Sequence, residues 1–124
     1  MILCDSDIVI EYLKGNINFK EKFEINKGKI VLSAITLMEL YYGALNKKEL
    51  NKIKKALSNF EIIFLNEKIT FISLQVIEIY SKSHGLKIPD ALIAATAIYS
   101  NLSLWTNNLK DFKFIKGLTL LDKN

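Results

Sequence analysis

The 124-residue chain contains one cysteine, one proline, one histidine and no arginine, and these scarcities exclude several classes of protein. A single cysteine, Cys4, cannot form an internal disulfide, and its place in an apolar segment predicts a buried thiol. No apolar run approaches the roughly 20 residues that a membrane-spanning helix needs. The first residues lack the basic segment and the cleavage site of a signal peptide. We therefore expect a cytoplasmic protein.

Proline and glycine are too scarce to form a linker. The one proline is Pro89, and the chain has five glycines. Half of the residues are hydrophobic and 24% are charged, which is ordinary for a globular protein. The sequence shows no repeat or low-complexity segment, and it predicts a single domain over residues 1–124.

All 17 basic residues are lysines, and with 13 acids they give a net charge of +4. If four acids gathered around a metal ion, the other nine would face 17 lysines, a net charge of +8. A basic exterior around an acidic centre suits a polyanionic substrate. A lysine-rich surface with no such partner explains the charge equally well.

Two kinds of apolar segment alternate along the chain. Short continuous runs predict buried strands at residues 2–4, 29–32, 61–65 and 102–105, and a weaker one at 118–121. Helical spacing predicts helices at about 7–15, 17–26, 34–45, 49–59 and 69–85, and Pro89 begins another. The apolar face of the helix at 69–85 includes Ile79. This alternation predicts an α/β three-layer sandwich, with a central, mostly parallel sheet of four to five strands and helices on both faces.

Four acids stand apart from the others, most of which lie among lysines. They are Asp5, Glu39, Asp90 and Asp111. In the predicted topology all four lie at one edge of the sheet, beyond the carboxyl ends of the strands, where such folds bind ligands. Structural interpretations remain open for each: an N-cap for Asp5 or Asp7, a capping box of Thr36 with Glu39, a helix-dipole position for Asp90, and a turn with Asn108 for Asp111.

Electrostatics favours a metal ion at such an edge. Two carboxylates about 4 Å apart repel by roughly 4 kcal/mol at an effective dielectric constant near 20. Mg²⁺ or Mn²⁺ relieves that repulsion, because both cations prefer carboxylate and water oxygens. The sequence offers no histidine–cysteine set for zinc, and the single histidine, His84, is expected at the surface near a helix end.

Four segments, in this order and at these separations, resemble the PIN-domain family, and specifically the VapC-type toxins of bacterial toxin–antitoxin pairs. They are residues 2–10, 33–44, 88–97 and 106–112. The resemblance covers essentially the whole chain. It implies a PIN-like fold and a metal-dependent endoribonuclease that leaves a 5′-phosphate and a 3′-hydroxyl.

The resemblance also implies roles for particular residues. Asp5, Glu39, Asp90 and Asp111 would be the catalytic, metal-binding acids for Mg²⁺ or Mn²⁺. The implied site-supporting residues are Ser6, Thr106, Asn107 and Asn108. Asp7 departs from the family, which usually has Asn, Ser or Thr there; we interpret it as a helix cap rather than an additional metal ligand.

The implied partners are RNA, a small antitoxin protein with its own DNA-binding segment, and a second copy of the chain in a homodimer. Candidate contact surfaces are Tyr41, Tyr42 and the face around Tyr12 and Leu13, although core packing explains these residues as well.

Two alternatives of other classes remain. The sequence Asp5-Ser6-Asp7 matches the Asp-x-Asp of haloacid-dehalogenase-like phosphatases, in which the first aspartate is the nucleophile. A non-catalytic α/β partner module could use the acids only to bind Mg²⁺.

Overall fold

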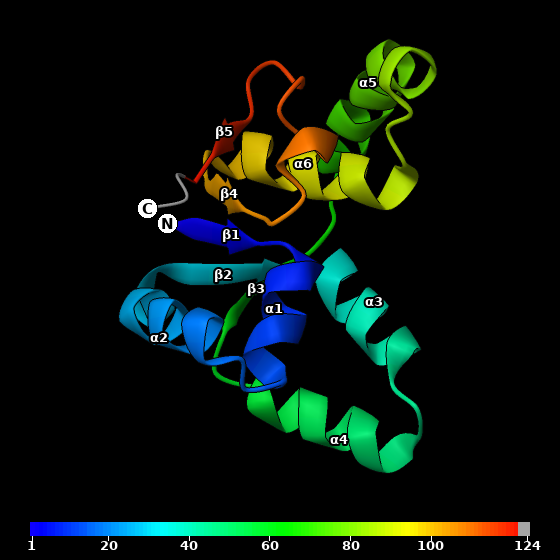
Figure 1. Ribbon diagram of the computed structural model, residues 1–124. Coiled ribbons are helices and arrows are strands. Elements are labelled where there is room, and N and C mark those ends of the chain that lie inside the picture. The colour runs from blue at the N-terminus through cyan, green and yellow to red at the C-terminus, as the bar shows by residue number, and fades with distance from the viewer. Residues whose placement is uncertain (122–124) are drawn as a thin grey trace.

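The computed structural model describes residues 1–121 and contains a five-stranded parallel sheet (Figure 1). The strands are β1 (Ile2–Cys4), β2 (Ile30–Ser33), β3 (Glu61–Ile63), β4 (Ser103–Trp105) and β5 (Thr119–Leu120), in the spatial order β3-β2-β1-β4-β5. The chain builds outward from β1 to β3 and then crosses to β4 and β5 on the other side. The reversal lies between β1 and β4, where parallel sheets leave a crevice for ligands.

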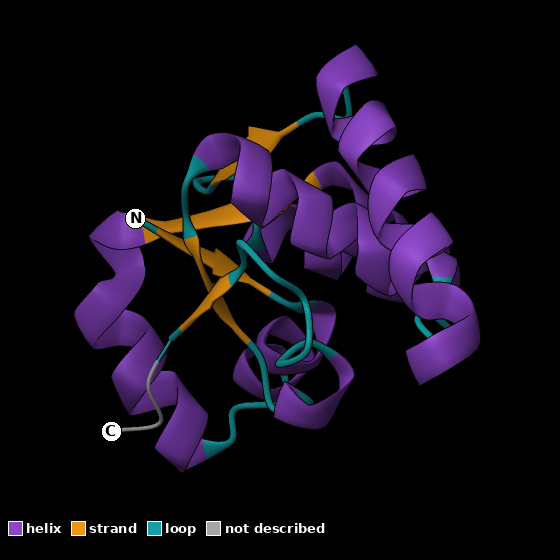
Figure 2. Ribbon diagram, turned by 90° about the horizontal axis from the view of Figure 1, so that it is seen from above, coloured by secondary structure: helices purple, strands orange, loops and turns teal. Residues whose placement is uncertain are grey.

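Within residues 1–121, six α-helices and two short 3-10 helices connect the strands. They are α1 (Ser6–Leu13), α2 (Ile17–Asn26), η1 (Lys27–Lys29), α3 (Ala34–Gly43), α4 (Lys47–Ala56), α5 (Glu67–His84), α6 (Ile88–Ser100) and η2 (Leu109–Asp111). Figure 1 shows α5 and α6 on one side of the sheet and α1, α2 and α4 on the other. Seen from above in Figure 2, the strands are twisted relative to one another. The predicted three-layer α/β sandwich is confirmed.

Alternate residues of β1 face two separate cores. Ile2 and Cys4 pack with Phe23 and Trp105 on the α1 and α2 side, whereas Leu3 packs on the α6 side. Cys4 is fully buried as predicted, and burial raises the pKa of its thiol. α6 packs with small side chains that are almost completely buried: Ala91, Ala94, Ala95 and Ala97.

Two predictions of burial are wrong. The segment 61–65 is not a buried strand, because β3 is the outermost strand and only three residues long. Glu61 at its start is exposed, and Phe64 just beyond it is 72% exposed. Ile79 of α5 is 62% exposed. Apolar character predicted burial in both places, but only Ile62 and Ile63 pack partly against the two cores, whereas Phe64 and Ile79 are exposed.

Side-chain caps set some helix ends that apolar spacing left imprecise. α4 begins at Lys47 rather than Glu49, because Asn46 Oδ1 accepts a hydrogen bond from the Glu49 backbone N–H at 2.9 Å. α5 ends at Gly85 as predicted, and the φ of 69° there is the left-handed conformation that favours glycine. Across the described residues, the helices all lack the combination of length and apolar character that crossing a membrane requires.

Candidate active site

Asp5 lies in the middle of the carboxyl edge of the sheet. It follows β1 directly, is the N-cap of α1 and is only 6% exposed. Its Oδ1 accepts a hydrogen bond from the backbone N–H of Ser6, and its Oδ2 accepts one from the Thr106 hydroxyl, each at 2.8 Å. Thr106 follows β4, so the parallel pairing of β1 with β4 brings the two side chains together. Asp5 therefore caps a helix and faces the crevice at the same time.

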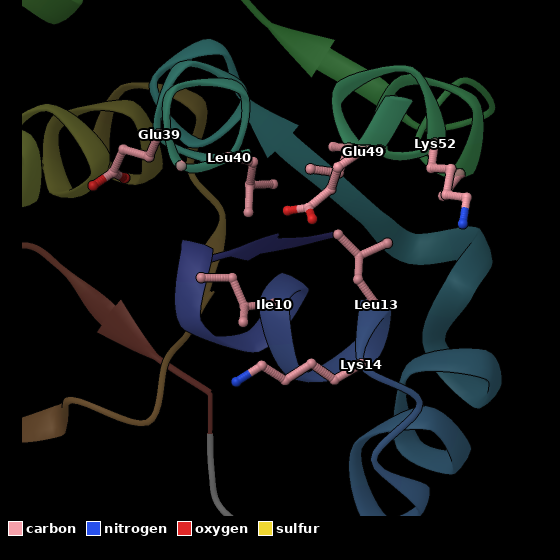
Figure 3. Close-up of a pocket in the computed structure, with 10 residues that line it drawn as sticks. Ile10, Leu13, Lys14, Glu39, Leu40, Glu49 and Lys52 are labelled. Carbon is pink, nitrogen blue, oxygen red and sulfur yellow. The ribbon is translucent and has the colours of Figure 1, made fainter. Parts of the chain in front are cut away.

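Glu39 reaches this edge from the middle of α3. The hydroxyl of Ser6 donates to Glu39 Oε1 at 2.6 Å, and Figure 3 shows the Glu39 carboxylate pointing from α3 toward α6. The alternative interpretation of Thr36 and Glu39 as a capping box is contradicted by the structure. The N-cap of α3 is Ser33, whose hydroxyl accepts from the backbone N–H of Ile35 at 3.2 Å. Glu39 is therefore not needed at the helix start and binds a side chain of α1 instead.

Asp7 connects α1 to the loop after β4. Its Oδ1 accepts from the backbone N–H of the next residue at 2.8 Å, and its Oδ2 accepts from the backbone N–H of Asn107 at 2.9 Å. The interpretation of Asp7 as the helix cap is wrong, because Asp5 holds that position. In the same loop the Asn108 backbone N–H donates to the Thr106 hydroxyl at 3.0 Å. The loop thus supports the site through backbone N–H groups and one hydroxyl.

Asp90 and Asp111 approach from the helices that flank β4. Asp90 is half-buried in the first turn of α6, and Asp111 is exposed at the end of η2. The backbone N–H of Asp111 donates to the Asn108 carbonyl at 2.9 Å, which forms the predicted turn. Burial raises the pKa of Asp90, the charges of Asp111 and Glu39 raise it further, and Lys87 opposes them. These charges act on one another, so the residues share one neighbourhood.

Five carboxylates therefore gather at this edge, and we call them the acidic cluster: Asp5, Asp7, Glu39, Asp90 and Asp111. Burial raises the pKa of Asp5 from 3.8 to about 7, and the charges of Asp7 and Asp90 contribute. Hydrogen bonds from Thr106 and Ser6 act in the opposite direction but do not cancel the shift. The hydrogen bonds to Asp5 and the positive charge of Lys87 therefore do not fully offset burial and charge repulsion within the cluster.

The donor chemistry of the acidic cluster fits a hard divalent cation. Within residues 1–121, no three acidic, histidine or cysteine side chains converge closely enough to ligate one ion together as they stand. Mg²⁺ does not require such a cage, because it keeps several waters and is commonly held by one or two carboxylates. Burial is the largest cause of the raised pKa of Asp5 and Asp90, and cation binding would relieve the charge repulsion that adds to it.

A groove between α1, α3 and α4 was not evident from the sequence. Its cavity of about 530 Å³ is lined by apolar side chains, Ile10, Leu13 and Leu40 among them, and by two acids and two lysines: Glu39, Glu49, Lys14 and Lys52. Figure 3 shows Leu13, Leu40 and Glu49 pointing into the space between the three helices. Because Glu39 belongs to both the groove and the acidic cluster, the groove leads to the candidate site.

The suggested contact residues divide into core and surface. Tyr12 stacks on Phe23, with ring centroids 4.0 Å apart, so its ring packs against the core. Tyr42 is 94% exposed on α3, whereas Tyr41 is half-buried. Lys87 is a residue that the sequence analysis missed. Its only sequence signal is its position three residues before Asp90.

Both the sequence and the fold of this chain are similar to those of known proteins. The PIN domain family profile matches residues 2–117. The chain is 35% identical over 126 residues to ribonuclease VapC1 of Methanocaldococcus jannaschii, covering 98% of this chain and 88% of that protein. It superposes with a TM-score of 0.85 and 31% identity on a chain of Rickettsia felis VapBC2 bound to a promoter DNA fragment, over the whole of both chains. A toxin–antitoxin complex from Klebsiella pneumoniae gives a TM-score of 0.81 and 34% identity over 96% of each chain.

Proposed function

This chain belongs to the PIN-domain family, and on that premise we propose that it is a VapC-type endoribonuclease that hydrolyses RNA phosphodiester bonds with Mg²⁺ or Mn²⁺. The observation that carries the proposal is the acidic cluster at the carboxyl edge of the parallel sheet. Buried, mutually repelling carboxylates with raised pKa values are typical of functional sites. The excess of lysines on the rest of the chain is compatible with a polyanionic substrate.

In this mechanism Asp5 and Asp90 would hold the cation, and Glu39 and Asp111 would contribute directly or through water. The bound cation would supply Lewis acidity, which lowers the pKa of water and offsets the charge that develops on the phosphate. Thr106 fixes the orientation of Asp5 through its hydroxyl, and Ser6 fixes that of Glu39.

Water activation can also involve the protein itself. A carboxylate of the cluster that is not bound directly to the cation can orient the attacking water or accept its proton. Glu39 suits this role, because it is exposed and is held by a hydrogen bond from Ser6 at 2.6 Å. Hydrolysis on the 3′-oxygen side of the phosphate would leave a 5′-phosphate and a 3′-hydroxyl.

The direct test is cleavage of labelled single-stranded RNA oligonucleotides by the purified protein. We expect Mg²⁺ or Mn²⁺ to support cleavage and EDTA to stop it. Each cut should leave a 5′-phosphate on the downstream fragment and a 3′-hydroxyl on the upstream fragment. Cation binding without cleavage of any RNA would favour the non-catalytic alternative. The PIN match over residues 2–117 leaves the phosphatase alternative without support, and both oxygens of its nucleophile, Asp5, accept hydrogen bonds.

We propose that the groove between α1, α3 and α4 binds a segment of a small antitoxin. The apolar walls at Ile10, Leu13 and Leu40 suit apolar side chains of the partner, and the two acids and two lysines of the lining can pair with partner side chains of either charge. A segment bound there would lie beside Glu39 and could therefore block the acidic cluster. The similarity to a solved toxin–antitoxin complex supports an antitoxin partner, and the choice of this groove rests on its shape and lining.

Ile10→Glu should weaken antitoxin binding by at least about tenfold. Ile10 is 38% exposed at the groove, and the new carboxylate would lose its hydration against the apolar side chains of the partner. The measurement is co-purification and titration calorimetry with the small protein encoded beside this chain. Ile17→Glu is the matched control, because Ile17 is 77% exposed on α2 outside the groove. Equal affinity of both variants would refute this location.

We also propose that the chain forms a homodimer through α5, where Phe71, Leu74 and Ile79 are each more than 60% exposed. Three large apolar side chains exposed on one helix suit a symmetric, self-complementary contact. Leu74→Glu should convert a dimer of twice 14.2 kDa into a monomer in light scattering, and Ile17→Glu should not. A monomeric wild-type protein at micromolar concentration would contradict the dimer.

A further inference from the structure

Asp90 and Asp111 also border a small hollow on the α5 side of the acidic cluster. The hollow has a volume of about 70 Å³, and its other walls include His84, Lys87 and Phe114. Neither His84 nor Lys87 has a part in the mechanism above. A histidine and a lysine are therefore placed beside two of the acids that we assign to the reaction.

The imidazole of His84 is held in a fixed orientation at the end of α5. One ring face stacks on Phe114, with centroids 4.2 Å apart and planes 13° from parallel. Tyr80 contacts the ring in an edge arrangement at 5.7 Å, and the Ser83 hydroxyl lies 2.7 Å from His84 Nδ1. His84 is nevertheless an exposed residue, so part of its ring remains accessible to solvent beside Phe114. A flat, fixed and solvent-facing ring is a surface on which a planar group can stack.

Lys87 provides a positive charge next to this ring. It is the N-cap residue of α6, is exposed, and makes no side-chain capping hydrogen bond. Its charge lowers the pKa of Asp90, which shows that it lies within electrostatic reach of the acidic cluster. A polyanion that approaches five carboxylates needs such a cation at their margin.

We propose that the outer face of His84 stacks on a nucleobase of the RNA substrate, and that Lys87 binds a phosphate that flanks the scissile bond. This inference rests on the proposed ribonuclease function and specifies where the substrate strand lies. Single-stranded RNA is bound in this way, by aromatic or histidine rings that stack on unpaired bases and by cations along the backbone. The hollow is too small for a base, so the base lies on the ring while Lys87 faces the backbone.

The test of stacking compares His84→Ala with His84→Phe. Loss of a stacked base is worth about 1–3 kcal/mol, so His84→Ala should raise the KM for RNA by roughly tenfold with little change in kcat. His84→Phe keeps a flat ring on Phe114 and should stay within about threefold of wild type. Tyr99→Ala is the control, because Tyr99 is 45% exposed near the opposite end of α6. Equal losses in both His84 variants would indicate a hydrogen-bonding or proton-transfer role and overturn the proposal.

A substrate with one abasic nucleotide separates stacking from other effects. Scanned along the strand, the abasic position should weaken wild-type binding at one site only, and that loss should vanish in His84→Ala. Binding is measured on the Asp5→Asn background, so that RNA is not cut. If an abasic nucleotide and His84→Ala weaken binding independently at every position, so that their effects add, then no base stacks on His84. That result would contradict the inference even if wild-type protein cleaves RNA normally. Absence of cleavage by wild type would instead contradict the proposed function, while the binding assay would still test the inference.

Lys87→Ala should reduce the slope of log RNA affinity against log salt concentration by the amount expected for one phosphate contact. Lys68→Ala is the matched control, because Lys68 is exposed at the other end of α5, 16 residues from His84 and thus about 24 Å along the helix. Identical salt slopes for wild type, Lys87→Ala and Lys68→Ala would overturn the assignment of Lys87.

Discussion

Asp5→Asn and Asp90→Asn are each expected to reduce RNA cleavage by more than about 100-fold. Losing a residue that only orients a metal ligand commonly costs 10- to 100-fold in affinity or activity, and losing the ligand itself should cost more. Asparagine keeps the size of aspartate but has no negative charge to offer a cation. The measurement is the single-turnover rate on labelled RNA at saturating Mg²⁺ or Mn²⁺.

These variants should fold, which makes a loss of activity interpretable. Asparagine caps helices as well as aspartate does, so Asp5→Asn keeps an acceptor for the Ser6 backbone N–H. Its amide can donate to the Thr106 hydroxyl in place of the hydrogen bond that Asp5 accepts. Glu78→Gln, at an exposed position on α5, should retain full activity. Wild-type rates in Asp5→Asn or Asp90→Asn would remove the metal-dependent mechanism proposed here.

The general position of the acidic cluster followed from the sequence because topology determines it. Strand-like runs at 2–4 and 102–105 predicted neighbouring parallel strands, and residues that follow such strands meet at one edge. Asp5 and Thr106 are separated by 101 positions, yet the pairing of β1 with β4 brings them within hydrogen-bonding distance. No detail of side-chain packing was needed for that prediction.

The partners of individual side chains could not be predicted in the same way. Thr36 and Glu39 have the spacing of a capping box, but Ser33 caps α3 and Thr36 is buried. Asp5 and Asp7 are both of a residue type that caps helices. The structure places Asp5 at the N-cap of α1 and Asp7 in its first turn. Local spacing permits several hydrogen bonds, and the tertiary arrangement selects one.

The groove and the hollow at His84 also could not be predicted from sequence patterns. Ile10 and Ile53 belong to different helices, and their relation depends on how α1 and α4 pack. His84 was correctly expected at the surface near a helix end. Its stacking on Phe114 joins residues 30 positions apart, and no periodic pattern records such a contact.

In EDTA, the metal-free protein should lose stability as the pH rises from about 4 to 7. The pKa of Asp5 is raised from 3.8 to about 7 by burial first and by Asp7 next, so the folded state holds its proton over a range in which the unfolded state has released it. The stabilisation that comes from this higher proton affinity of the folded state is fully present below pH 4 and is lost as the pH passes through 7. Asp7 and Asp90, whose pKa values are also raised by burial, change stability in the same direction.

Asp5→Asn isolates this contribution, because asparagine does not ionise and the other acids remain. The free energy of unfolding of wild type relative to Asp5→Asn should fall by about 4 kcal/mol between pH 4 and 8, measured by urea denaturation in EDTA. Mn²⁺ should restore stability to wild type at pH 8 but hardly at pH 5, because protons and the cation compete for the same carboxylates. A difference between the two proteins that stays constant with pH would mean that Asp5 is ionised throughout. The repulsion on which the metal proposal rests would then be absent.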